Sequence, residues 1–321
     1  MGTLDHLSGK RLLVTGGAGF IGSHLVNRLI RTGANVTVLL KSGEPLWRLT
    51  VNAGQYYAVT ADIADSSAIS RLFTDMRPDG VFHLAAYGVD SAAQDVNTAI
   101  RVNVLGTVNV LNGMNASGCH RIVTMGSGAE YGNHEGLIRE GAALFPGNVY
   151  ASTKAAAALI AHQYAAEMGI SIVTLRPFGV YGEAEPKHKL FCHAILTMLS
   201  GDDLDLTACT QKRDYCYVED VVDALILSFT NTALTNDILN VGTGVALPLR
   251  YYIEHIRAQI KPSGRVRYGV LPFRSNEVWS PVPDVSLIRQ RLGWQNTYSL
   301  EDGLNKTIQW FREHRHYYEN N

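Results

Sequence analysis

Thr15-Gly16-Gly17-Ala18-Gly19-Phe20-Ile21-Gly22 directly follows a short apolar segment and opens an amphipathic one. Glycines at this point let the backbone turn tightly and approach a pyrophosphate, whose charge lies at the helix N-terminus. The spacing is Gly-x-x-Gly-x-x-Gly with an additional Gly17, rather than Gly-x-Gly-x-x-Gly. Similar turns occur without a ligand, but the position between a first strand and a first helix favours a dinucleotide site. The expected contacts are Gly16, Gly19, Phe20, Ile21 and Gly22.

Around this turn, short apolar segments alternate with longer helical ones. The expected strands are Arg11–Val14, Asn35–Leu40, Gln55–Val59, Gly80–Leu84, Arg121–Met125 and Ile170–Leu175. The expected helices are Phe20–Arg31, Ser67–Met76, Ala99–Gly113 and Tyr150–Met168. The strands lack a clean apolar–polar alternation, which suits burial on both faces. The pattern predicts an α/β fold, a doubly wound parallel sheet of the Rossmann type.

The regular alternation loosens after Arg176-Pro177. Beyond it we expect the helices Val218–Phe229, Leu249–Ile260 and Leu300–Arg315 and the strand Asp237–Val241. Residues 1–176 are therefore expected to form a dinucleotide-binding domain, and residues 177–321 mainly a smaller C-terminal α/β substrate lobe. Residues 214–242 are expected to pack back onto the first domain. The cleft between the two parts would hold the substrate.

The composition argues against several classes of protein. The 28 basic and 29 acidic side chains nearly cancel, so nothing favours nucleic acid or an anionic membrane as a partner. No run of 18 apolar residues appears, and the first ten residues lack the apolar part of a signal peptide. The four cysteines show no zinc-like spacing, so we expect reduced thiols in a cytoplasmic protein without a metal site.

Tyr150 and Lys154 are four residues apart in an alanine-rich helical segment. Residues at this spacing share a helix face, so the Lys154 ammonium would favour the Tyr150 phenolate and lower its pKa. Such a tyrosine exchanges a proton with a sugar or alcohol oxygen while a nicotinamide handles the hydride. Ser127, after the fifth expected strand, completes a candidate catalytic set.

The end of the second expected strand bears on which dinucleotide binds. NAD sites usually place an acid there, about 20 residues beyond the glycines, to bind the ribose 2′-hydroxyl. Here Leu40 is followed by Lys41 and Ser42, and no acid occurs before Glu44. A cation and a hydroxyl suit a 2′-phosphate, so the sequence favours NADP(H), with tightly bound NAD as the alternative. If Lys41 is only a solvated loop charge, the preference disappears.

Two further strand ends would border the cofactor. Asp62 and Ile63 follow the third strand, where the carboxylate is placed to accept a hydrogen bond from the adenine amino group. Leu84, Ala85 and Ala86 end the fourth strand with the small residues that a close approach to the cofactor requires.

With these and other motifs the chain resembles the extended short-chain dehydrogenase/reductase family of nucleotide-sugar epimerases, dehydratases and reductases. The similarity covers nearly the whole chain. The matching motifs are the glycine turn continued by Ser23-His24-Leu25, Asn103-Val104-Leu105-Gly106-Thr107, Ser127…Tyr131-Gly132, Tyr150…Lys154, Leu175-Arg176-Pro177-Phe178, Arg213-Asp214-Tyr215-Cys216-Tyr217-Val218-Glu219-Asp220-Val221, and Leu292-Gly293-Trp294 followed by Ser299-Leu300-Glu301-Asp302-Gly303-Leu304.

The resemblance implies a role for each matching residue. Tyr150 would be the acid/base, Lys154 would lower its pKa and bind the nicotinamide ribose, and Ser127 would hydrogen-bond the reacting oxygen. Asn103 and Pro177 would join the cofactor site. The substrate would be a nucleotide-diphosphate sugar, bound by Tyr87, Ser127, Gly128, Gly179, Leu190, Arg213, Arg274 and Glu277.

Three of these substrate residues carry charge. Arg213 would meet the diphosphate, because a guanidinium fork suits phosphate oxygens. Arg274 and Glu277 would lie near the diphosphate and the ribose, although a salt bridge between the lobes explains Glu277 equally well. The resemblance further implies a homodimer formed through the helices Ala99–Gly113 and Ala151–Met168.

Departures from the family pattern narrow the chemistry. The family's 4,6-dehydratases carry Asp-Glu directly after the catalytic Ser or Thr, whereas this chain has Gly128 and Ala129. Glu130 comes one place later and would point to the other face if it continued a strand. We therefore exclude a dehydratase. Gly179 replaces an Asn that is usual in the family, which removes one polar contact with the substrate.

Three functions remain. The first is an NADPH-dependent 4-ketoreductase acting on a nucleotide-linked 4-keto-6-deoxyhexose, with hydride transfer to C4 and Tyr150 as the proton donor. The second is an NAD-dependent nucleotide-sugar 4-epimerase, which uses the same residues and is disfavoured by the missing acid after Leu40. The third is a non-catalytic NADP-binding regulatory subunit, which would normally have lost part of the catalytic set.

Overall fold

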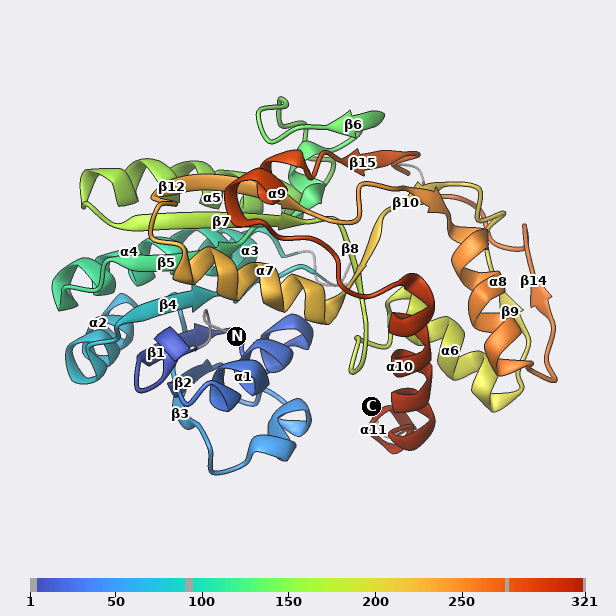
Figure 1. Cartoon of the computed structure of the whole chain (residues 1–321), viewed down its shortest axis with the longest axis horizontal. Helices are drawn as coiled ribbons and strands as arrows, with labels where there is room; N and C mark the ends of the chain where they lie inside the picture. The colour runs from blue at the N-terminus through green and yellow to red at the C-terminus, as the bar shows by residue number, and fades with distance from the viewer. Residues whose placement is uncertain (1–4, 90–94, 275–276, 320–321) are drawn as a thin grey trace.

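A seven-stranded sheet forms the centre of the molecule, as a computed structural model covering residues 5–89, 95–274 and 277–319 shows (Figure 1). Its strands are β1 (Arg11–Thr15), β2 (Asn35–Leu40), β3 (Tyr57–Thr60), β4 (Gly80–His83), β5 (Arg121–Met125), β7 (Ser171–Pro177) and β12 (Asn236–Val241). All neighbours pair in parallel in the order β12-β7-β5-β4-β1-β2-β3. The strand order reverses at β1, as in doubly wound sheets, so the predicted Rossmann fold is confirmed.

Helices cover both faces of this sheet (Figure 1). One face carries α1 (Phe20–Arg31) and α7 (Val218–Thr230), and the other carries α2 (Ser66–Met76), α4 (Gly106–Ser117) and α5 (Val149–Glu167). Alternate residues of a strand point to opposite faces. In β1, Leu12 and Val14 accordingly join the core beneath α1 and α7, while Leu13 joins the core on the opposite face. Burial on both faces explains why the inner strands β1, β4 and β5 lack an apolar–polar alternation.

A smaller unit lies beside the carboxyl ends of the strands (Figure 1). Its helices are α6 (Leu190–Ser200), α8 (Leu249–Ile260), α10 (Leu300–Glu313) and α11 (His316–Glu319). Short strand pairs complete it: β8 (Gly179–Tyr181) with β11 (Tyr215–Tyr217), β9 (Leu204–Asp205) with β14 (Val266–Arg267), β10 (Lys212–Arg213) with β13 (Leu247–Pro248), and β6 (Gly136–Ile138) with β15 (Pro281–Pro283). The aromatic side chains of Tyr181, Phe191 and Phe311 are buried in its core.

The chain returns to the first sheet after entering the smaller unit. β12 pairs in parallel with β7 along its full length, from Asn236 beside Ile172 to Val241 beside Pro177. α7 packs against α1, β5 and β7, and α9 (Ser286–Leu292) contacts β12. β12 therefore forms one edge of the central sheet, and α7 packs on its face.

The helix expected over Ala99–Gly113 has a different form in the structure. α3 (Val96–Ala99) continues into a π-helical segment, Ile100–Leu105, before α4 begins at Gly106. π-Helical turns are rare and commonly occur near functional sites. Here the widened turn holds Asn103, which is almost fully buried beside α5.

The structure also bears on membrane spans, metal sites and disulfides. Within the described residues, no helix is long and apolar enough to cross a membrane. The same part of the chain holds no cluster of three or more His, Cys, Asp or Glu side chains suited to a metal ion. All four cysteines are buried and unpaired.

Candidate active site

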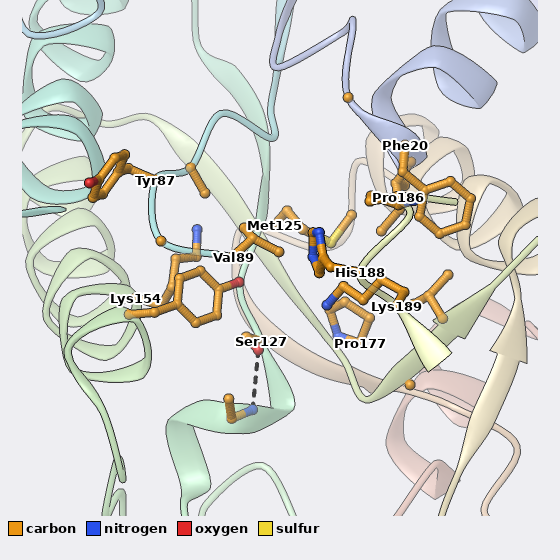
Figure 2. Close-up of a pocket in the computed structure, with 18 of the residues that line it drawn as sticks. Phe20, Tyr87, Val89, Met125, Ser127, Lys154, Pro177, Pro186, His188 and Lys189 are labelled. Atoms are coloured by element: carbon orange, nitrogen blue, oxygen red, sulfur yellow. Dashed lines mark hydrogen bonds between the residues drawn. The ribbon is translucent and has the colours of Figure 1, made fainter. Parts of the chain in front are cut away.

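One large cavity, of about 1810 Å³, lies where the carboxyl ends of the sheet strands meet the smaller unit. Its wall contains every predicted site residue except Asn103. Figure 2 shows Ser127 and Lys154 on one side, with Pro186, His188 and Lys189 extending from the other. The cavity therefore joins the predicted cofactor and substrate residues in one continuous space.

The glycine turn begins at the end of β1 and forms one end of this cavity. Gly16 has a φ of +70°, and a Cβ there would meet the backbone nitrogen of Ala85 at 2.7 Å. A Cβ on Gly22 would lie 2.1 Å from the carbonyl oxygen of Gly16. A Cβ on Gly19 meets the same oxygen at 3.2 Å. The close packing of α1 on the turn thus depends on Gly22, and the tight turn depends on Gly16.

Gly22→Ala is expected to weaken dinucleotide binding at least tenfold, because the new methyl group pushes α1 away from the turn. Dinucleotide titration followed by fluorescence measures the change. Gly141→Ala is the matched control, since a Cβ at Gly141 meets no atom within 4 Å and the residue lies off the cavity wall. Equal affinity in the Gly22 variant and the wild-type protein would contradict this account of the turn.

The three candidate catalytic residues come from two elements. Ser127 lies just after β5 and caps the short 3₁₀ helix Gly128–Tyr131, and its hydroxyl accepts a hydrogen bond from Ala129 N at 3.2 Å (Figure 2). Tyr150 and Lys154 lie in the first two turns of α5, whose N-terminus is capped by Asn148. The side chain of Lys154 is almost fully buried. A strand end and a helix start therefore bring Ser127, Tyr150 and Lys154 to the same part of the cavity wall.

The pKa of Tyr150 differs from the sequence-based expectation. Burial raises the pKa of Tyr150 to about 12, although the hydrogen bond with Ser127 acts to lower it and the charge of Glu130 raises it further. Burial also lowers the pKa of Lys154. The expected lowering of the Tyr150 pKa by Lys154 is therefore wrong for the protein alone, because desolvation disfavours both charged forms.

Glu130 does not continue β5, so the condition on which it would point to the other face is not met. It belongs to the 3₁₀ helix, where Oε1 accepts a hydrogen bond from Ser127 N at 2.7 Å. Oε2 accepts one from Arg176 Nε at 2.7 Å, and both side chains are almost completely buried. The carboxylate is thus bound inside the protein beneath Ser127.

Asn103 is the one predicted cofactor residue that lies away from the cavity wall. Its Oδ1 accepts from Tyr87 N at 2.7 Å, and its Nδ2 donates to Tyr87 O at 3.0 Å and to Thr153 Oγ1 at 2.8 Å. All its polar atoms are therefore engaged by the protein. Asn103 links the loop after β4 to α5, so it acts as a positioning residue here, and its expected cofactor contact stays a prediction. Figure 2 shows the ring of Tyr87 directed away from Ser127.

The turn after β2 lies at the end of the cavity with the glycines. Lys41 and Ser42 both line it, as do Glu44 and Arg48. The Glu44 carboxylate accepts a hydrogen bond from Lys41 N at 3.0 Å. The Arg48 guanidinium is held by Ala184 O at 2.9 Å. The turn thus presents the Lys41 ammonium together with one carboxylate.

Elsewhere on the cavity wall, two of the charged residues expected to contact the substrate form a pair. Arg213 donates to the Glu277 carboxylate and to Val278 O. Glu277 therefore forms a salt bridge, which is the alternative to a substrate contact that the sequence left open. Both residues also line the cavity, together with the exposed Arg274. The pair therefore orients the guanidinium at the cavity wall.

Two departures from the family pattern have a common steric basis. A Cβ on Gly128 would meet the ring of Phe178 at 2.8 Å. A Cβ on Gly179 would meet Asp214 O at 2.5 Å and the ring of Tyr215 at 2.6 Å. The ring of Phe178 thus leaves no room for a side chain at position 128, and Asp214 and Tyr215 leave none at position 179.

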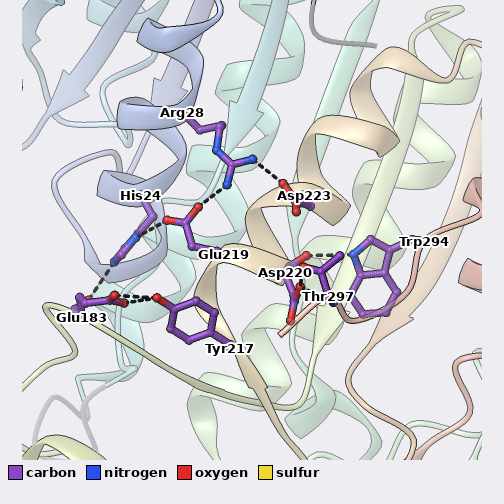
Figure 3. Close-up of polar contacts among 9 residues, drawn as sticks. All are labelled: His24, Arg28, Glu183, Tyr217, Glu219, Asp220, Asp223, Trp294 and Thr297. Atoms are coloured by element: carbon purple, nitrogen blue, oxygen red, sulfur yellow. Dashed lines mark hydrogen bonds and ion pairs between the residues drawn. The ribbon is translucent and has the colours of Figure 1, made fainter. Parts of the chain in front are cut away.

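The segment Gly182–Lys189 belongs to the stretch 179–190 on which, from the sequence, we expect the identity of the substrate to depend, and it carries His188 and Lys189 to the cavity. Side chains from elsewhere hold it in place (Figure 3). The His24 ring, on α1, bonds to Glu183 O and to the Glu219 carboxylate, each at 2.9 Å. The Tyr217 hydroxyl donates to the Glu183 carboxylate at 2.6 Å. The helix that begins at the glycine turn therefore helps to position this segment.

Further contacts reach the same segment from the C-terminal helix α11. The Tyr318 hydroxyl donates to Glu185 O at 2.8 Å, and Lys187 Nζ donates to Tyr318 O at 3.0 Å. Ala184 has a φ of +63°, which is unusual for a residue other than glycine. No local sequence signal predicts these contacts, because their partners are far apart in the chain.

Comparisons with known proteins agree with this architecture. A model of the NAD dependent epimerase/dehydratase family matches residues 12–242. A UDP-glucose 4-epimerase of Mycolicibacterium smegmatis is 32% identical, over 94% of this chain and 98% of that protein. The structure of a UDP-glucose 4-epimerase from Thermotoga maritima with UDP-glucose superposes with a TM-score of 0.88 at 28% identity, covering 94% of this chain and 99% of that one.

A second solved structure extends the similarity to a cofactor complex. The UDP-glucose 4-epimerase of Thermus thermophilus in complex with NAD has a TM-score of 0.85 at 28% identity, covering 95% of this chain and 99% of that one. The family model spans most of the chain, and the resemblance inferred from the motifs is confirmed. The chain belongs to the NAD dependent epimerase/dehydratase family.

Proposed function

We propose that the protein is an NADPH-dependent reductase of the C4 carbonyl of a nucleotide-linked 4-keto-6-deoxyhexose. The observation that carries the proposal is that Lys41 and Ser42 line the same cavity as Ser127, Tyr150 and Lys154. A cation and a hydroxyl at the end of β2 suit the 2′-phosphate of NADP(H). Reductases exchange their cofactor at every turnover, and cells supply reducing power mainly as NADPH.

The side chains of this site suit reduction. Bound NADPH supplies the hydride. Tyr150, with a pKa raised to about 12, stays protonated at neutral pH and holds the proton that a C4 oxygen needs. Ser127 places its hydroxyl beside the phenol, where it stabilises negative charge that develops on that oxygen. The Lys154 ammonium, on the same face of α5, supplies positive charge to the phenol and binds the nicotinamide ribose.

Elimination of water has no equivalent support. The positions after Ser127 hold Gly128 and Ala129, and Phe178 fills the space that a side chain at 128 would need. Glu130 is committed to Arg176 in the interior. These residues therefore favour reduction over a 4,6-dehydratase reaction.

A 4-epimerase with retained NAD is the second candidate, favoured by one specific observation. The Glu44 carboxylate lies on the cavity wall at the Lys41 backbone, close to where NAD sites carry an acid. All three similar proteins described above are named UDP-glucose 4-epimerase. A non-catalytic NADP-binding subunit is the third, and the presence of Ser127, Tyr150 and Lys154 around one cavity argues against it.

Cofactor identity separates these candidates. We expect the purified protein to release little nicotinamide cofactor when denatured and to bind NADPH at least tenfold more tightly than NADH. Lys41→Ala should weaken NADPH binding by about tenfold or more, because it removes a charged partner of the 2′-phosphate, and should change NADH binding less than threefold.

Lys10→Ala is the matched control, since Lys10 is exposed and lies off the cavity wall. Stoichiometric NAD released from the wild-type protein would contradict the reductase and support the epimerase.

We also infer a homodimer and a cytoplasmic location. On α5, Leu159 and Ile160 are exposed, and the adjacent π-helical segment exposes Ile100 and Leu105. Exposed apolar side chains gathered on neighbouring helices are typical of subunit interfaces. Light scattering on the purified protein measures the mass directly, and a monomer at micromolar concentration would contradict the dimer.

A further inference from the structure

Gln211 combines burial with an unsatisfied side chain. It immediately precedes β10 and is 4% exposed. Its backbone carbonyl accepts a hydrogen bond from Leu249 N at 2.9 Å, which fixes it against the start of α8. Its side-chain oxygen is shielded from solvent and has no hydrogen-bond partner among the described residues. The residue nevertheless forms part of the cavity wall.

Buried amide groups in proteins nearly always have a partner. Within the described part of the chain, the only other buried side-chain atom of this kind is Ser228 Oγ, on α7 and off the cavity wall. Gln211 is therefore the cavity-wall residue that carries such an atom, and a molecule in the cavity meets its oxygen once the amide turns. Rotation about its last side-chain bond exchanges the amide oxygen and nitrogen at little cost, so it can present an acceptor beside a donor.

The position of Gln211 along the wall indicates which part of a ligand it meets. Tyr215 pairs with Gly179, next to Phe178, whose ring packs on Gly128 beside the catalytic Ser127. Arg213 and Gln211 precede Tyr215 along one largely extended stretch of the cavity wall. At about 3.3 Å per extended residue, Gln211 lies roughly 13 Å along the backbone from Tyr215.

A nucleotide sugar has the same order of parts. Its sugar and its nucleoside are separated by a diphosphate, which is the group that suits the Arg213 guanidinium. With the sugar at Ser127 and the diphosphate near Arg213, the nucleoside reaches Gln211. Apolar side chains line this end too, among them Leu206, Leu249 and Leu271, and they suit the flat faces of a base.

We infer that Gln211 hydrogen-bonds the edge of the substrate's nucleobase and so determines which nucleotide the protein accepts. An amide matches a base edge that carries a donor beside an acceptor, and the identity of the base decides the fit. The inference rests on the proposed nucleotide-sugar substrate, but it is independent of whether C4 is reduced or epimerised.

Calorimetric titration with UDP, dTDP, CDP and GDP tests the inference without any turnover. The wild-type protein is expected to prefer one of the four. Gln211→Met, which removes both hydrogen-bonding atoms, should weaken binding of that nucleotide by about tenfold and change the others less than threefold. Gln211→Glu keeps the shape but cannot donate, so it should show the same selective loss and serves if the Met variant folds poorly.

Thr210→Val is the control, because Thr210 is exposed and lies off the cavity wall. An equal loss for all four nucleotides would place the contact on the ribose or phosphates and overturn the inference. Unchanged binding in both Gln211 variants would overturn it while leaving the proposed function standing. If the selective loss is found but no 4-keto sugar nucleotide is reduced, the proposed reaction fails and the inference survives.

Discussion

Replacing Tyr150 with Phe is expected to lower kcat by about 10²- to 10⁴-fold, the usual contribution of a positioned proton donor or acceptor. The phenol lines the cavity beside Ser127, and burial raises its pKa to about 12, so it is present as a proton donor at neutral pH. Phe keeps the ring and removes only the hydroxyl. The Kd of the dinucleotide should stay within threefold of the wild-type value, which separates lost chemistry from lost binding.

Steady-state rates and dinucleotide titration on the same samples measure both effects. Tyr164→Phe is the matched control, because Tyr164 lies on the same helix, where its hydroxyl donates to Asn112 Oδ1 at an exposed position. Removing the Tyr164 hydroxyl should leave kcat nearly unchanged. Full activity in the Tyr150 variant would remove Tyr150 from the reaction, and with it both the reductase and the epimerase proposals.

The second large effect is expected in stability. Glu130→Gln should reduce the free energy of unfolding by about 3–5 kcal/mol, the typical result of removing one partner from a buried ion pair. The Arg176 guanidinium is 2% exposed and also donates to the Tyr131 hydroxyl at 3.0 Å. With Glu130 neutralised, this charge stays buried without its partner. Urea unfolding monitored by circular dichroism measures the change.

Two further variants test whether the unpaired charge of Arg176 causes the loss of stability. Asp205→Asn weakens the exposed ion pair with Arg267 and should cost less than about 1 kcal/mol. The double variant Glu130→Gln, Arg176→Met removes the unpaired charge and should regain part of the lost stability. If Glu130→Gln alone lowers the free energy of unfolding by less than about 1 kcal/mol, the buried pair contributes little to folding.

Local sequence patterns predicted the sheet well, because each strand carries its own signal. β2 occupies Asn35–Leu40 as expected, and β5 occupies Arg121–Met125. α5 begins one residue before the expected Tyr150 and therefore carries both Tyr150 and Lys154. The placement of the candidate catalytic residues was predictable for the same reason, since the helical spacing and the strand end determine which way each residue faces.

The remaining features depend on contacts between distant parts of the chain. Arg176 decides where the Glu130 carboxylate points, and Phe178 decides that position 128 has no room for a side chain. The raised pKa of Tyr150 comes mainly from burial, which the spacing to Lys154 does not reveal. The π-helical turn around Asn103 is likewise set by its bonds to Tyr87 and Thr153, so a helix pattern alone predicts an ordinary α-helix there.

The late return of the chain to its sheet has a consequence for biosynthesis. β7 emerges from the ribosome well before β12, the strand that covers its edge. Until Asn236–Val241 is made, the apolar β7 presents free backbone groups, which are a template for pairing with other chains. Nascent chains that already contain β7 but not yet β12 are thus the ones most in need of chaperones. A fragment ending at residue 176 would keep that edge open permanently, so the whole chain is the proper unit for expression.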